Sequence, residues 1–201
     1  MTHRMEHLIT QMKEDYDDLM IIDHKEYVKL FQFLKIKCYK KGEILKSHDE
    51  LELVSRYIFK GDIAEYEYRA KKFYCRKVFS APDTACDFES YRSEETSNIT
   101  LKAFTDVQVG ELQKSDEFSV IEYIPVFAKL ALRINHRIAK IDRQWKRLHW
   151  LEKKEAYNTL QKLCPVFNQL QVAEISAILN IPERSVFRIR KELANEFRSF
   201  K

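Results

Sequence analysis

The chain has 201 residues, 45% of them hydrophobic, and a formal net charge of +4, so it can form one large domain or two small ones with a proper core. Its N-terminal segment is too charged for a signal peptide, and no apolar run approaches the roughly 20 residues of a membrane span, so a cytoplasmic protein is expected. The four cysteines form no CxxC or paired His/Cys motif, which argues against a disulfide scaffold and against a metal site: Cys38, Cys75, Cys86 and Cys164.

The first predicted elements are helices over residues 4–34, where apolar side chains recur at helical spacing. From about residue 36 to 113 the pattern changes to short strands, and all three glycines of the chain lie in this stretch. The predicted strand segments are 36–45 around Gly42, 54–69 around Gly61, 71–80, 98–104 and 107–113. Many short strands around one closed core predict a small antiparallel barrel or roll.

Residues 117–148 are predicted to form one long helix, with Pro125 in its first turn. Apolar residues recur there at alternating spacings of 3 and 4, which is a heptad pattern. The resulting seam consists of Ile124, Phe127, Ala131, Ile134, Ile138, Ile141, Trp145 and Leu148. A narrow seam of this kind fits a partner helix, so we predict that it pairs with a second copy of the chain. Burial of the seam inside its own domain is the alternative.

The most specific pattern lies near the C-terminus. After a helix over 150–163, two short helices are expected at about 171–179 and 183–196, because apolar residues give each of them a buried face. Between these two helices, Asn180 tolerates the left-handed conformation of a tight turn and Pro182 can open a helix. Together these features predict a helix-turn-helix.

Basic side chains occupy the face of the second helix that should point outward, and they are of the types that bond phosphates and guanine edges. We predict that five residues contact DNA: Arg184, Ser185, Arg188, Arg190 and Lys191. Positive charge is also concentrated before this motif, since residues 129–163 hold ten Lys and Arg against three Asp and Glu. A two-helix hairpin with a merely basic surface is the alternative.

The order of these parts resembles the Crp/Fnr family of bacterial transcription regulators, over nearly the whole chain from about residue 24. The segments that carry the resemblance are YKKGEIL (39–45), YIFKGDIAEYEY (57–68), KKEAYNTLQKLCP (153–165) and EISAILNIPERSVFRIRKEL (174–193). The resemblance implies an α+β fold with an antiparallel β-roll like that of cyclic-nucleotide-binding domains, a long dimerisation helix and a C-terminal helix-turn-helix of the winged-helix type. The corresponding expected domains are 1–116, 117–148 and 149–201.

The same resemblance implies a homodimer that binds an inverted repeat in double-stranded DNA and works with RNA polymerase, without contacting a membrane. Carried over residue by residue, it implies that Arg184, Ser185 and Arg188 reach base edges, while Arg190 and Lys191 contact the backbone.

One region departs from the family pattern. Members that bind cyclic AMP hold its phosphate with a Gly-Glu step and an Arg followed by Ser or Thr. Here the two positions align near Cys86-Asp87 and Ser97-Asn98, with no glycine and no cation, and only Arg92 lies near in sequence. Cyclic AMP is therefore not expected, and no cofactor is predicted. An effector of unidentified chemistry would meet five residues: Cys86, Asp87, Phe88, Ser97 and Asn98.

Other interpretations remain open at this point. The chain could be a small-molecule sensor or adaptor without DNA-binding activity, although the basic second helix argues against it. Cys75 and Cys86 could sense oxidants, but a single cysteine on a strand is more often a buried apolar residue. No nucleophile elbow, phosphate-binding loop, dinucleotide motif or metalloprotease motif is present, so we do not expect an enzyme.

Overall fold

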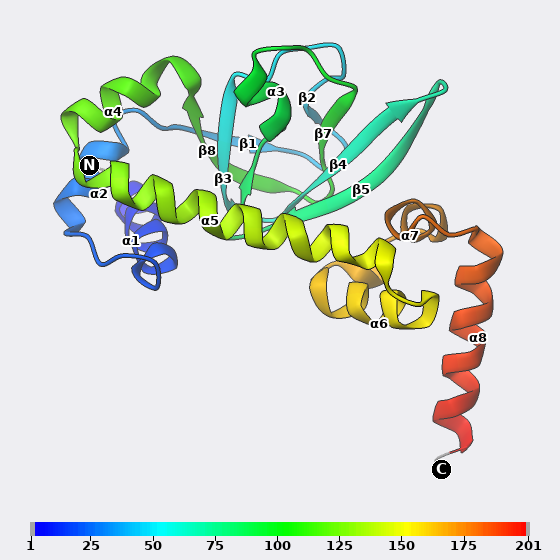
Figure 1. Ribbon diagram of the computed structural model, residues 1–201. Coiled ribbons are helices and arrows are strands. Elements are labelled where there is room, and N and C mark those ends of the chain that lie inside the picture. Colours follow the sequence, from blue (N-terminus) through cyan, green and yellow to red (C-terminus); the bar gives the residue numbers. More distant parts are fainter. Residues whose placement is uncertain (1–2, 200–201) are drawn as a thin grey trace.

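A computed structural model describes residues 3–199, except for the side chains of residues 4 and 197–199. N-terminal helices, a β-roll, a long helix and a helical C-terminal part follow one another along the chain (Figure 1). The predicted α+β class with an antiparallel roll is confirmed. None of the described helices is both long and apolar enough to cross a membrane.

The N-terminal helices are α1 (His3–Asp17) and α2 (His24–Leu30). Asp23 ends the connection between them and caps α2, because its carboxylate accepts a hydrogen bond from the backbone N–H of Lys25 at 3.0 Å. The apolar faces of both helices share one core with β3 and with the residues around the start of the long helix. Its members include Ile9, Met12, Tyr27, Phe59, Ile124 and Leu130.

The β-roll consists of two antiparallel sheets with strand orders β1-β8-β3-β6 and β2-β7-β4-β5. The strands are β1 (Lys35–Tyr39), β2 (Ile44–Lys46), β3 (Val54–Lys60), β4 (Asp62–Arg69), β5 (Lys72–Ser80), β6 (Thr84–Ala85), β7 (Ile99–Ala103) and β8 (Val107–Gln113). A short helix, α3 (Phe88–Ser93), connects β6 to β7. The core of the roll includes four fully buried aliphatic side chains, Ile58, Ile63, Leu101 and Val109.

Gly61 makes the tight connection between β3 and β4 possible. Its φ of +88° lies in the region that residues with a Cβ rarely adopt, and an added Cβ would stand only 2.3 Å from the backbone oxygen of Asp106. The predicted turn at this glycine is thus explained by both backbone conformation and close approach.

The helix predicted over residues 117–148 is interrupted. It consists of α4 (Glu117–Tyr123) and α5 (Val126–Arg147), and a 3-10 turn at Leu148–Trp150 follows. The break falls at Ile124, whose backbone has φ −134° and ψ 72°. The expectation of one continuous helix was wrong because Pro125 disfavours the helical conformation of the residue before it.

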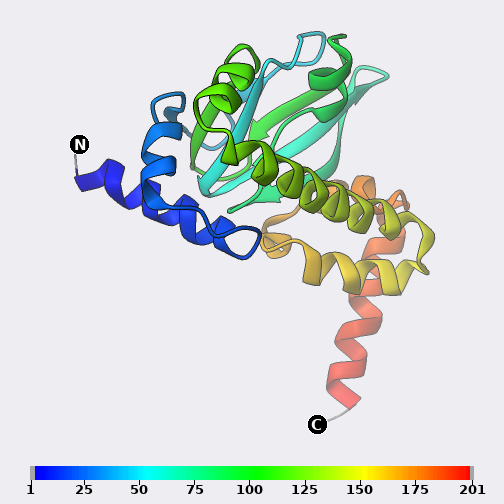
Figure 2. The same ribbon diagram turned by 60° about the vertical axis from the view of Figure 1, so that its left-hand side comes forward.

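The C-terminal part contains α6 (Lys153–Leu163), a 3-10 turn (Phe167–Gln169), α7 (Val172–Leu179) and α8 (Glu183–Ser199). Within residues 114–199 the chain is helix, turn and loop, so the strands of the expected wing are not seen in that range. One hydrophobic core joins this part to the roll, because Ala64 and Cys75 pack with Trp145 and Ile178. The C-terminal end of α8 projects away from the rest of the molecule (Figure 2).

Candidate nucleic-acid interface and effector cavity

The turn between α7 and α8 fixes where α8 begins. Asn180 ends α7 with φ 52° and ψ 45°, the left-handed conformation predicted for it. Ser176 closes the turn, because its hydroxyl donates to the backbone oxygen of Ile181 at 2.6 Å. At the other end of α7, the Glu174 carboxylate accepts from the backbone N–H of Gln171 at 2.9 Å. The short helix α7 is therefore held at both ends.

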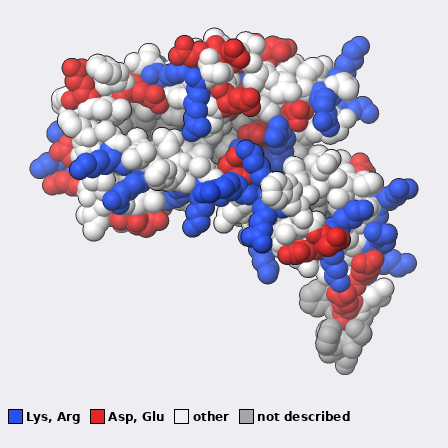
Figure 3. Space-filling model, in the orientation of Figure 1, with Lys and Arg blue, Asp and Glu red and all other residues white. Residues whose placement is uncertain are grey.

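One face of α8 is buried and the opposite face is open to water. Val186 is fully buried and Ile189 is 2% exposed, and both belong to the C-terminal core. The exposed face carries residues spaced 3, 1 and 3 apart, which lie on one side of a helix: Arg184, Phe187, Arg188 and Lys191. We call these four residues the α8 stripe. Lys and Arg side chains are visible along α8 and along α5 (Figure 3).

Two of the predicted DNA contacts lie elsewhere. Ser185 is only 6% exposed, because it falls on the buried side of α8 with Val186. The position of Ser185 therefore contradicts its assignment as a base-contacting residue. Arg190 is half-buried, and its Nε donates to the Tyr157 hydroxyl of α6 at 3.1 Å. Its guanidinium is engaged within the chain, so we do not assign it to the backbone of DNA.

Side chains from the roll and from the 3-10 turn after α5 hold α7 in position. The Tyr66 hydroxyl of β4 donates to a Glu174 carboxylate oxygen at 2.7 Å. A ring nitrogen of His149 lies 2.8 Å from the backbone oxygen of Ile178. Since α7 also packs against β5, the orientation of α8 is tied to the roll. A change in the roll can therefore change the orientation of α8.

The predicted effector residues divide between a cavity and the protein interior. Asp87, Phe88, Ser97 and Asn98 line a cavity of about 900 Å³ between α3, β5 and α5. Cys86 does not line it and is fully buried. The structure therefore brings four of the five predicted residues together and places the fifth outside the cavity.

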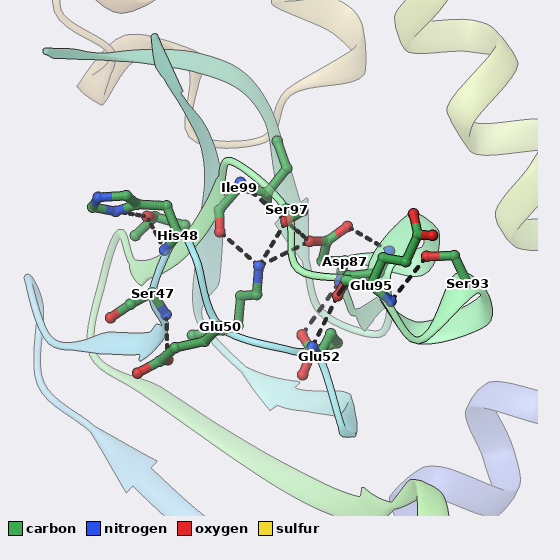
Figure 4. A network of polar contacts seen from close by, with 12 residues as sticks. Ser47, His48, Glu50, Glu52, Asp87, Ser93, Glu95, Ser97 and Ile99 are labelled. Atoms are coloured by element: carbon green, nitrogen blue, oxygen red, sulfur yellow. Dashed lines mark hydrogen bonds and ion pairs between the residues drawn. The ribbon is translucent and has the colours of Figure 1, made fainter.

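A buried ammonium group, that of Lys46, lies behind three of the residues that line this cavity: Asp87, Ser97 and Ile99. Nζ of Lys46 donates to Asp87 Oδ2 at 3.0 Å, Ser97 Oγ at 2.7 Å and the backbone oxygen of Ile99 at 2.9 Å. The three acceptors are turned toward one another in Figure 4, and Ser97 also donates to the Asp87 carboxylate. The side chains of Lys46 and Asp87 are 2% and 4% exposed. This arrangement uses all three N–H donors of the ammonium.

The ammonium group of Lys46 is not free to bind a cyclic nucleotide phosphate. A phosphate needs free donors, and those of Lys46 are already taken by protein acceptors. Arg92, the nearest cation in sequence, is exposed and lies over the Phe88 ring at 5.8 Å.

The two cysteines considered as redox sensors are both buried. Burial raises the pKa of the Cys75 thiol and of the Cys86 thiol well above the ordinary range. Because the thiolate is the reactive form, both groups stay protonated and unreactive at neutral pH. They serve as small apolar residues of the core.

The predicted dimer seam is divided in the structure. Its ends are buried in the chain's own cores, at Ile124, Phe127, Trp145 and Leu148. Its middle is half-buried, at Ala131, Ile134, Ile138 and Ile141. The first three of these line a largely apolar cavity of about 410 Å³, which α4, α3 and the β3 side of the roll complete. Only the middle of the seam is open enough to meet another chain.

Sequence reasoning missed two notable residues. Phe187 is 57% exposed in the middle of the α8 stripe, and its position followed from the burial of Val186 and Ile189. Lys46 gave no signal, because its partners Asp87 and Ser97 are distant in sequence and a lysine in KGEILK reads as a surface residue.

No protein-family model and no curated protein matches the sequence. Several solved structures are similar. The c-di-GMP responsive global regulator CLP of Xanthomonas campestris is 11% identical, with a TM-score of 0.65 over 87% of this chain and 93% of its own. A CooA mutant from Carboxydothermus hydrogenoformans is 12% identical, with a TM-score of 0.63 over 84% and 79%. A CRP/FNR-family transcriptional regulator from Thermus thermophilus is 14% identical, with a TM-score of 0.60 over 81% and 87%. The chain thus has the fold of CRP/FNR regulators.

Proposed function

We propose that the chain is a sequence-specific DNA-binding transcriptional regulator that acts as a homodimer on an inverted repeat. The α8 stripe is the observation that carries this proposal. Arg184, Arg188 and Lys191 are exposed on one side of a helix whose other side is anchored in a core. Such a helix can enter a major groove without losing its own packing. The likeness to CRP/FNR regulators supports the same conclusion at the level of the fold.

The guanidinium groups of the stripe are available to a ligand. Within the described part of the chain, Arg188 forms an ion pair with Glu192 at 3.7 Å, and both side chains are largely exposed, at 65% and 49%. An exposed pair of this kind contributes little free energy, so DNA can displace it. Bound as a dimer, the chain would place two such helices about one duplex turn apart, roughly 34–36 Å, and would change how RNA polymerase uses the promoter.

The salt dependence of DNA binding tests this interface. We expect Lys191→Gln to weaken binding by a similar factor for all sequences and to reduce the slope of log K against log salt by about 1 for each chain, because one phosphate contact is lost. The matched control is Lys35→Gln, an exposed lysine of β1. Titrations at four salt concentrations measure both slopes. An unchanged slope for Lys191→Gln would show that Lys191 does not contact the DNA backbone.

The middle of the α5 seam supports the homodimer. Ala131, Ile134 and Ile138 border the cavity of about 410 Å³, and its rim includes Ile121, which is 43% exposed. Apolar surface of this kind is typically covered by a partner. The same surface is continuous with α5, which leads to α6 and α8.

We expect light scattering to give twice the chain mass of 24.1 kDa for the wild type and 24.1 kDa for Ala131→Glu. The reason is that a carboxylate in an apolar interface has no partner there. Lys140→Glu, on the exposed side of the same helix, should remain dimeric. Circular dichroism checks that both variants fold. A monomeric wild type at micromolar concentration would refute the homodimer.

An effector, if the chain uses one, would act through the cavity next to α3. That cavity is bounded by Asp142 and Lys146 of α5 as well as by the roll. A ligand there contacts both parts and could favour one orientation of α5, and with it one spacing of the two α8 helices. We do not propose a cyclic phosphate as this effector, because the two positions that the resemblance implies for its binding hold Cys86-Asp87 and Ser97-Asn98.

A further inference from the structure

We propose that Phe187 reads the methyl group of a thymine in the DNA site. This inference rests on the proposed function, because it assigns a base to the same helix. It names thymine as the base that Phe187, the aromatic residue of the α8 stripe, would recognise.

Phe187 is 57% exposed, while the side chains next to it on the opposite face are buried. Within the described part of the chain, its ring takes part in no stacking or cation–ring contact. Among the described residues the ring therefore has neither an aromatic nor a cationic partner. It stands between two exposed cations, one turn back at Arg184 and beside it at Arg188.

The charges around Phe187 indicate which kind of partner binds there. An apolar protein surface would leave both guanidinium groups without a partner, whereas duplex DNA supplies phosphate oxygens and guanine acceptors for them. In the major groove, only thymine presents a methyl group, and phenylalanine is among the side chains that contact it. DNA is thus the partner that satisfies the ring and its two flanking cations together.

The length of the stripe agrees with this assignment. From Arg184 to Lys191 the helix rises about 10 Å, at 1.5 Å per residue. That length corresponds to about three base-pair steps of 3.4 Å. Phe187 lies in the middle of it, so its thymine should lie between, or next to, the bases that Arg184 and Arg188 contact.

Replacing thymine by deoxyuridine tests the proposal, because this removes the methyl group and leaves base pairing unchanged. The probe is the duplex that the wild type selects, with each thymine of both half-sites replaced in turn. We expect one position per half-site at which the wild type binds about fourfold more weakly, which is the loss for one buried methyl group. Replacement in both half-sites should then weaken binding about fifteenfold.

The variant Phe187→Ala should bind the thymine and deoxyuridine duplexes equally well. Lys191→Gln removes a proposed contact to the DNA backbone, so it should lose affinity on deoxyuridine substitution by the same factor as the wild type. Melting temperatures check that Phe187→Ala folds, and its exposed position predicts little change. A wild type indifferent to deoxyuridine at every position would overturn the proposal. So would a Phe187→Ala variant that keeps the full response. Failure of the wild type to bind any duplex would instead refute the proposed function itself.

Discussion

Replacing Lys46 by methionine is expected to lower the free energy of unfolding by about 3–5 kcal/mol. The ammonium and its partner Asp87 are 2% and 4% exposed. Methionine nearly matches the length of the lysine side chain but leaves the carboxylate buried without its counter-charge. Ser97 can still donate to that carboxylate, but a hydroxyl supplies no full positive charge.

Urea unfolding followed by circular dichroism measures this loss. The double variant Lys46→Met/Asp87→Asn should recover part of it, because no buried charge is then left unpaired. The matched control is Lys40→Met, which removes an ion pair with Asp106 whose side chains are 80% and 62% exposed, and it should unfold like the wild type. A Lys46→Met variant as stable as that control would show that the buried pair contributes little.

Arg188→Ala is expected to reduce affinity for the selected site by a factor of about 5 to 150 for each half-site, the range for one bidentate arginine–guanine contact. Arg184→Ala should have an effect of the same order. Both losses should be larger on the selected site than on unrelated DNA, because base contacts distinguish sequences and phosphate contacts do not.

Fluorescence anisotropy with specific and unrelated duplexes gives both affinities at one salt concentration. Arg143→Ala serves as the control, since this exposed arginine lies on α5 and outside the stripe. Equal losses on both duplexes would make Arg188 a phosphate contact. An unchanged affinity on the selected site would exclude it from the interface.

Much of the fold was accessible from local patterns. The short strands around Gly42, Gly61 and Gly110 follow alternation and turn chemistry, which are visible in a few residues at a time. The interruption at Ile124 was accessible as well, since Pro125 restricts the residue before it. The sequence did not reveal what the α5 seam packs against, because the heptad pattern is the same whether its apolar side meets the roll or a second chain.

The site was partly predictable, and the errors have a physical cause. Ser185 lies four residues before Ile189, so the burial of Ile189 already placed Ser185 on the inner face and Phe187 on the outer one. Lys46 and Asp87 are 41 positions apart. Their meeting depends on how β2 and α3 come together, which no local pattern reveals.

Selection of bound sequences from a random duplex pool at about physiological salt tests the central claim most directly, with Arg184→Ala/Arg188→Ala as the control. We expect the wild type to enrich an inverted repeat whose half-sites lie about one duplex turn apart, and the double variant to enrich none. Enrichment of the same repeat by the double variant, or no enrichment by the wild type, would contradict sequence-specific binding through α8.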